Sequence, residues 1–110
     1  MENSGEYINV DDALRRIGGS ISLYKRLLTQ FTGAGYIGPL EEALNSGNKE
    51  EAAHLVHTLK GVCANLSLIK LAAVSAELEH NIKDGSDHSG SFAELKQAYA
   101  ITTEKIAEIM

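Results

Sequence analysis

Apolar residues recur at intervals of three and four positions through most of this 110-residue chain, and no stretch shows convincing alternation between apolar and polar residues. Spacing of three and four places apolar side chains on one face of an α-helix, whereas strict alternation would place them on one face of a strand. There are no internal repeats and no low-complexity segments. The pattern therefore predicts a single all-α domain.

Residues that favour helix caps and turns separate the apolar segments. Asn48 with Glu51 and Ser91 with Glu94 stand at the spacing of capping boxes, and Ser67 can cap the helix that follows it. Glycines at 33 and 35 leave open whether the second and third segments form one bent helix. The expected helices cover residues 10–17, 20–31, a segment around Leu40 and Leu44, 48–66, 67–82 and 91–109.

This succession predicts four main helices joined by short connections, with one short helix in front of them. Short connections favour antiparallel neighbours, so we expect an antiparallel four-helix bundle with a short additional N-terminal helix. Residues 1–8 are expected to be a flexible N-terminal segment, and residues 9–110 the bundle domain.

Composition and charge narrow the classes of function. A formal net charge of −5 disfavours nucleic acid as the main partner, because phosphate contacts need a basic face. No apolar run approaches the roughly 18 residues of a membrane span, and the first residues do not resemble a signal peptide. Cys63, the single cysteine, is expected to be a small buried hydrophobic residue. These features favour a cytoplasmic protein.

His57 points away from the apolar stripe of its own predicted helix. It lies about 160° from the middle of the stripe, so we expect it to face solvent or the edge of a neighbouring helix. Small residues share its face: Ala53, Gly61 and Ala64. Glycine inside a helix costs about 1 kcal/mol relative to alanine, so Gly61 indicates either open access to the imidazole or close helix packing. The stripe consists of Ala52, Leu55, Val56, Leu59, Val62, Cys63 and Leu66.

The segment AHLVHTLKGVCA, residues 53–64, resembles the signature of histidine-containing phosphotransfer (HPt) domains of two-component phosphorelays. That signature is a histidine, an apolar residue two positions later, then lysine-glycine and small residues. The flanks are also similar, so the resemblance covers about residues 9–109. It implies that His57 is the phosphoacceptor and that Lys60 and Gly61 are its helical neighbours. The sequence departs from the family at Ser67, where glycine is common, which bears on the shape of that turn.

The chemistry of these residue types agrees with the resemblance. A free imidazole is largely neutral near pH 7 and is a competent nucleophile. Lys60 lies one helical turn beyond His57, where its ammonium can offset phosphoryl charge, and Gly61 gives steric access. The chain has no Walker-type loop and no evident Mg²⁺ carboxylate cluster. We therefore expect a phosphocarrier without its own cofactor, not an enzyme.

The resemblance also implies the partners of the chain. They are response-regulator receiver domains, a hybrid sensor histidine kinase, or both, and the receiver supplies the Mg²⁺ and the acidic pocket. His54, Ala53 and Ala64 are expected to form the receiver docking face around His57. The chain is expected to be a monomer, either free-standing or part of a larger kinase.

Two alternatives remain beside this hypothesis. The first is a helical docking module that binds receiver or kinase domains without being phosphorylated. The second is a metal site, because His54 and His57 stand at ligand spacing and Glu77 with His80 makes one Glu-x-x-His pair. Helical di-metal sites need two such pairs, so no metal site is expected. The charged residues Lys70, Glu77, Glu79 and Lys83 are interpreted as a solvated helix face, and the aromatic residues Tyr24, Phe31, Phe92 and Tyr99 as core.

Overall fold

The computed structural model describes residues 6–110, and these form helices without any strand. The all-α prediction is therefore confirmed. No helix within this range is long and apolar enough to cross a membrane. The helices are α1 (Val10–Arg16), α2 (Ile21–Gly33), α3 (Ile37–Asn45), α4 (Lys49–Asn65), α5 (Ile69–Asp84) and α6 (Ser89–Ile109).

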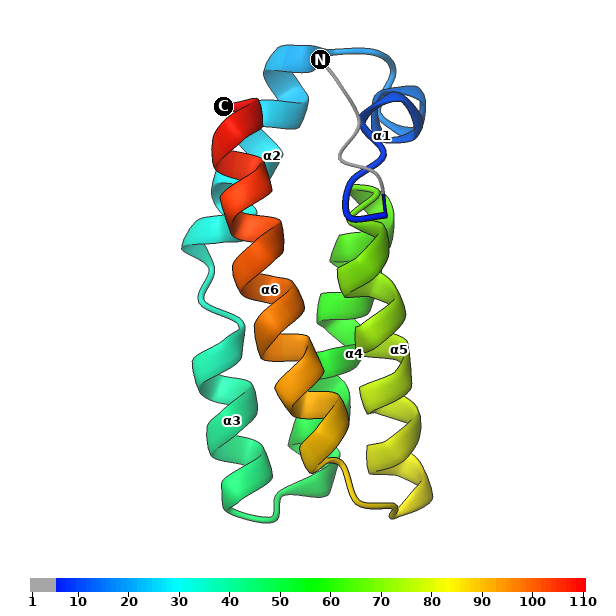
Figure 1. Ribbon diagram of the computed structural model, residues 1–110, viewed down its shortest axis with the longest axis vertical. Coiled ribbons are helices and arrows are strands. Elements are labelled where there is room, and N and C mark those ends of the chain that lie inside the picture. The colour runs from blue at the N-terminus through cyan, green and yellow to red at the C-terminus, as the bar shows by residue number, and fades with distance from the viewer. Residues whose placement is uncertain (1–5) are drawn as a thin grey trace.

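The helices form an elongated bundle with extents of 40 × 22 × 22 Å. Helices α3, α4, α5 and α6 run alternately down and up along the long axis, so sequential neighbours are antiparallel (Figure 1). Helix α2 lies above α3, and residues 34–36 separate the two, so they are not one continuous helix. The short helix α1 lies beside the upper ends of α4 and α5. This arrangement confirms a helical bundle with an additional N-terminal helix.

The sequence predicted that residues 1–8 form a flexible segment. Residues 1–5 lie outside the described residues. Of the following three, Ile8 is fully buried and Tyr7 lies beneath the ammonium of Lys105, which is 5.6 Å from the centre of its ring. The packed part of the chain thus includes residue 8.

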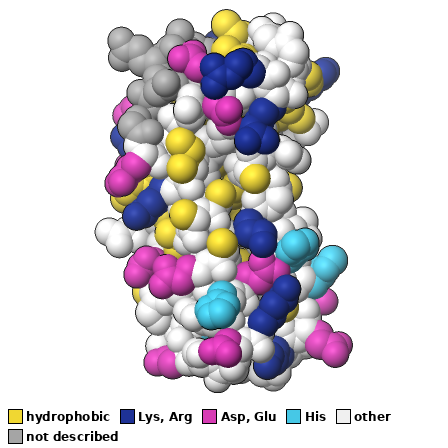
Figure 2. Space-filling model, turned by 90° about the vertical axis from the view of Figure 1, so that its right-hand side faces the viewer, with side chains coloured by type: hydrophobic (Ala, Val, Ile, Leu, Met, Phe, Trp, Pro, Cys, Tyr) yellow, Lys and Arg dark blue, Asp and Glu magenta, His cyan; other side chains and the backbone are white. Residues whose placement is uncertain are grey.

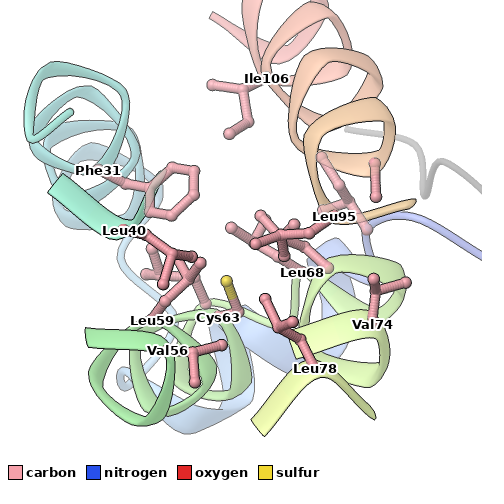
Figure 3. Packing of buried hydrophobic residues seen from close by; sticks show 14 of the residues in the cluster. Phe31, Leu40, Val56, Leu59, Cys63, Leu68, Val74, Leu78, Leu95 and Ile106 are labelled. Atoms are coloured by element: carbon pink, nitrogen blue, oxygen red, sulfur yellow. The ribbon is translucent and has the colours of Figure 1, made fainter. Parts of the chain in front are cut away.

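The core lies along the bundle axis and draws side chains from every long helix (Figure 3). Cys63 is buried there, as the sequence predicted, and burial raises the pKa of its thiol to about 12. Such a thiol is chemically inert at neutral pH. The predicted core aromatics Tyr24 and Phe31 are buried, and Phe31 packs against Tyr99 with ring centres 5.7 Å apart. Core packing on one side of α4 fixes which of its residues face outward.

Helix caps agree with the sequence at some positions and differ at others. Asn48 caps α4 by accepting a hydrogen bond from the backbone N–H of Glu51 (3.2 Å), as expected. The prediction for Ser91 was wrong: α6 begins at Ser89, and Ser91 lies inside its first turn. The hydroxyl of Ser91 donates to the carbonyl of His88 (3.2 Å) and accepts from Asn81 Nδ2 (2.9 Å). A serine inside the first turn has this local partner, so the sequence pattern placed the helix start too late.

The prediction that Ser67 caps α5 was also wrong. Leu68 is the cap residue, and Ser67 stands in the turn between α4 and α5 with φ +54°. Its hydroxyl donates to Asp12 Oδ2 (2.6 Å), and its carbonyl accepts from the backbone N–H of Asn9 (3.0 Å). Ser67 therefore connects the N-terminal helix to the α4–α5 turn.

Candidate functional site

Helix α4 presents His57 to solvent. Val56 and Leu59, which flank His57 in the sequence, are buried in the core. The His57 side chain, by contrast, is 65% exposed. Because α4 is held on its apolar face by α3 and α5, the imidazole is fixed on the outer surface of the bundle. Its outward position agrees with the orientation expected from the helical spacing.

A carboxylate from a different helix contacts this imidazole. Glu79 of α5 lies with Oε2 at 2.9 Å from His57 Nδ1, although the two residues are 22 positions apart in the chain. Its side chain is only 6% exposed. The interpretation of Glu79 as part of a solvated helix face was therefore wrong. Packing of α5 against α4 turns this carboxylate toward the histidine.

Two lysines complete the contacts of Glu79. Lys60 Nζ donates to Glu79 Oε1 at 2.6 Å, and Lys83 Nζ lies 3.0 Å from Oε2. Burial raises the pKa of the Glu79 carboxyl, but the hydrogen bonds from Lys60, Lys83 and His57 outweigh this effect and lower it to about 2. Glu79 is therefore an anion at neutral pH. The cluster joins one carboxylate to one imidazole and two ammonium groups.

The contact with Glu79 determines which nitrogen of His57 is free. A carboxylate anion only accepts hydrogen bonds, so the hydrogen of a neutral ring in this contact belongs on Nδ1. Nε2 then carries the lone pair. Because Nδ1 faces the buried carboxylate of Glu79 and most of the side chain is exposed, Nε2 lies on the part of the ring that Glu79 does not contact. The same logic holds the histidine of a Ser–His–Asp triad in one tautomer.

The other residues of the expected docking face differ in their exposure to solvent. Gly61, His54 and Ala64 are exposed, and Ala53 is half-buried. A Cβ added at Gly61 would meet no atom within 4 Å beyond the helix's own backbone. Gly61 is therefore not required for close helix packing, which was the alternative explanation for it. At Gly61, one turn from the histidine, the surface has room for a side chain.

Histidines lie beside lysines and acidic side chains in the lower half of the face shown in Figure 2. Across residues 6–110, no group of three or more His, Cys, Asp or Glu side chains is arranged to hold a metal ion. Glu77 and His80 are exposed on α5. The cluster around Glu79 pairs one carboxylate with cationic side chains.

Sequence reasoning identified His57, Lys60 and Gly61 but not Glu79. A signal was present, because Glu79 follows Leu71 and Ser75 at helical spacing on the buried side of α5. An acidic residue at such a position needs a charged partner. The identity of that partner depends on how α5 packs against α4, which the spacing within one helix does not determine.

Comparison with known families agrees with this geometry. The family model of the Hpt domain matches residues 29–104, which is more than half of the chain. The chain belongs to the Hpt domain family. Among curated proteins and solved structures, none matches the chain significantly.

The family match includes His57, Lys60, Glu79 and Lys83, while α1 lies before it. Hpt domains are phosphotransfer modules of two-component systems. They are phosphocarriers and not catalysts, and they interact with receiver domains. Membership thus establishes the general class of this protein.

Proposed function

We propose that His57 accepts a phosphoryl group from the aspartyl phosphate of one receiver domain and passes it to the aspartate of another. The observation that carries this proposal is the exposed imidazole whose Nδ1 is engaged by the buried Glu79 carboxylate. This contact leaves Nε2 as the nucleophile, on the part of the ring that Glu79 does not contact. An Hpt domain with this arrangement can receive a phosphoryl group without a catalytic centre of its own.

The step balances as a substitution at phosphorus. The lone pair of His57 Nε2 forms the N–P bond while the O–P bond of the aspartyl phosphate breaks, and that electron pair stays on the aspartate. The proton on Nδ1 remains in place, and the ring gains positive charge that the Glu79 carboxylate stabilises. Return of the phosphoryl group to a second aspartate reverses the same changes.

Phosphoryl transfer depends mainly on positioning and on charge stabilisation. Lys60 lies on the same helix as His57 and is half-buried, with its ammonium already on the side of the ring where Glu79 lies. It supplies positive charge for the phosphoryl oxygens. Mg²⁺ and the acidic pocket are expected on the receiver.

The receiver is proposed to dock over the open surface formed by Gly61, Ala64, Ala53 and His54. This surface surrounds the imidazole without covering it, and the absence of a side chain at Gly61 leaves room for a bulky partner. The protein is proposed to act as a monomer in this encounter, because a self-association over the same surface would exclude the receiver.

A labelling experiment tests the proposal. The protein is incubated with a receiver domain phosphorylated on its aspartate, in the presence of Mg²⁺, and the label is followed with time. We expect an acid-labile, base-stable label linked through Nε2, and its loss in the His57→Gln variant. His80→Gln is the matched control, because His80 is an exposed histidine on α5, outside the proposed docking surface, and its loss should leave labelling intact.

Equal labelling of His57→Gln and the unmodified protein would contradict the proposal. A receiver that binds tightly but never labels the protein would instead support the docking module that functions without phosphorylation. Phosphorus NMR of the labelled protein distinguishes the Nε2 from the Nδ1 isomer. Label on Nδ1 would contradict the assignment of the free nitrogen.

A further inference from the structure

Lysines from two different helices bind the same buried carboxylate. Lys60 of α4 contacts Glu79 Oε1, whereas Lys83 of α5 contacts Oε2, the oxygen that also faces His57 Nδ1. Lys83 follows Glu79 by one helical turn and is 63% exposed. The two lysines are therefore not equivalent: one shares the helix of the histidine, and the other shares the helix of the carboxylate.

Their difference matters when charge arrives at Nε2. An incoming phosphoryl group attracts the nearest mobile ammonium, and Lys60 lies one turn from His57 on the same helix. If Lys60 leaves Oε1, the buried Glu79 anion loses its shortest contact. A buried carboxylate without a cationic partner is strongly disfavoured, so it would turn toward solvent or take up a proton. Either change would break its contact with Nδ1.

Lys83 can prevent this change. Its bond to Glu79 spans i and i+4 within α5, so it does not depend on the position of Lys60 or on the state of His57. We propose that Lys83 is a positioning residue that holds the Glu79 carboxylate against His57 Nδ1 while Lys60 turns to the phosphoryl group. The movement of Lys60 to the phosphoryl group rests on the proposed function. The contact by which Lys83 holds Glu79 concerns the unphosphorylated protein alone.

The first test uses the free protein and needs no phosphoryl donor. Nitrogen-15 NMR of the His57 ring reports the fraction of neutral imidazole that carries its hydrogen on Nδ1. We expect this fraction to fall in Lys83→Ala and to be restored in Lys83→Arg, which keeps the cation. Lys70→Ala is the matched control, since Lys70 is also on α5 and has no ion pair to Glu79 among residues 6–110. An unchanged ring spectrum when Lys83→Ala is made in a Lys60→Ala background, where no other lysine of the described chain holds Glu79, would overturn the proposal.

The second test asks whether Lys83 acts through Glu79. We expect Lys83→Ala to slow labelling of His57 by a phosphorylated receiver by roughly two- to fivefold, the range of a partly exposed ion pair. In a Glu79→Ala background the same substitution should have no further effect, because its target is gone. An equal loss in both backgrounds would show that Lys83 contacts the receiver directly and would overturn the positioning role.

The two tests also separate this inference from the proposed function. If the ring spectrum responds to Lys83 as expected but His57 is never labelled, then the positioning of the imidazole stands and phosphoryl transfer fails. If His57 is labelled but the ring spectrum does not respond to Lys83, then phosphoryl transfer stands and this inference fails.

Discussion

Gly61 and Ser67 lie near each other at the C-terminal end of α4, and at each position the backbone favours a different residue from the one present. Gly61 has helical geometry, in which alanine is more stable by about 1 kcal/mol. Ser67 has φ +54°, a left-handed conformation in which glycine is favoured and other residues cost roughly 1–2 kcal/mol. Each position therefore carries a local penalty.

Contacts with other residues offset the local penalty at Ser67 but not the one at Gly61. Ser67 recovers stability inside the molecule, because its hydroxyl donates to Asp12 and the turn accepts a bond from Asn9. Gly61 has no such contact, and an added Cβ would meet open space. Contacts within the fold explain why serine is tolerated at position 67. No contact among the described residues explains the glycine at position 61, so a partner is the reason we propose for it. The contacts of Ser67 serve stability, and the open space at Gly61 supports the proposal that this position serves docking.

The largest expected effect is that of a bulky side chain at Gly61 on the rate of labelling. Gly61→Leu should fold normally, since leucine favours helix and the space is open, yet it should slow labelling by a phosphorylated receiver by at least about tenfold by obstructing the partner. Ala107→Leu, an exposed substitution near the end of α6, is the control and should leave labelling unchanged. Undiminished labelling of Gly61→Leu, with thermal unfolding as the check on folding, would remove Gly61 from the docking surface.

Substitution of Ser67 should change stability and not labelling. Ser67→Ala keeps the left-handed strain and loses the hydrogen bond to Asp12, so we expect the free energy of unfolding to fall by about 1–2 kcal/mol. Ser67→Gly loses the same bond but relieves the strain, so its loss should be smaller by about 1 kcal/mol. Urea denaturation of both variants measures the difference. Equal losses in the two variants would mean that the positive φ of Ser67 carries no penalty.

The same contrast explains how much the sequence could predict. Helical spacing predicted the outward position of His57, the burial of Cys63 and the cap at Asn48, because each depends on neighbours within about one or two turns of the same helix. Glu79 contacts His57, and Ser67 contacts Asp12, from different helices, at separations of 22 and 55 positions. Those contacts depend on how whole helices pack, which local spacing does not determine. The roles assigned to His57, Lys60 and Gly61 stay predictions.

The smallest expected effect is a dependence on pH of the stability that each position contributes. The contribution of Ser67 should depend on pH, whereas that of Gly61 should not. The hydrogen bond from Ser67, together with Arg16, lowers the pKa of the Asp12 carboxyl to about 2 from an ordinary value of 3.8. A carboxyl whose pKa is lower in the folded state contributes stability above its unfolded pKa and loses it as the pH falls toward the folded pKa. The contribution of the Ser67–Asp12 bond should therefore be complete at pH 5 and decline between about pH 4 and pH 2.

Urea denaturation of the unmodified protein and of Ser67→Ala at pH 5, 3 and 2 measures this decline. The two proteins should differ most at pH 5 and converge as Asp12 takes up its proton, because the bond to an ionised acceptor is stronger than that to a neutral one. In an Asp12→Asn background the effect of Ser67→Ala should no longer vary with pH. Gly61→Ala is the matched comparison and should raise stability equally at all three values, since no titrating group compensates for the missing side chain. A Ser67→Ala difference that persists unchanged at pH 2 would show that the turn is held by its backbone contacts and not by the charge of Asp12.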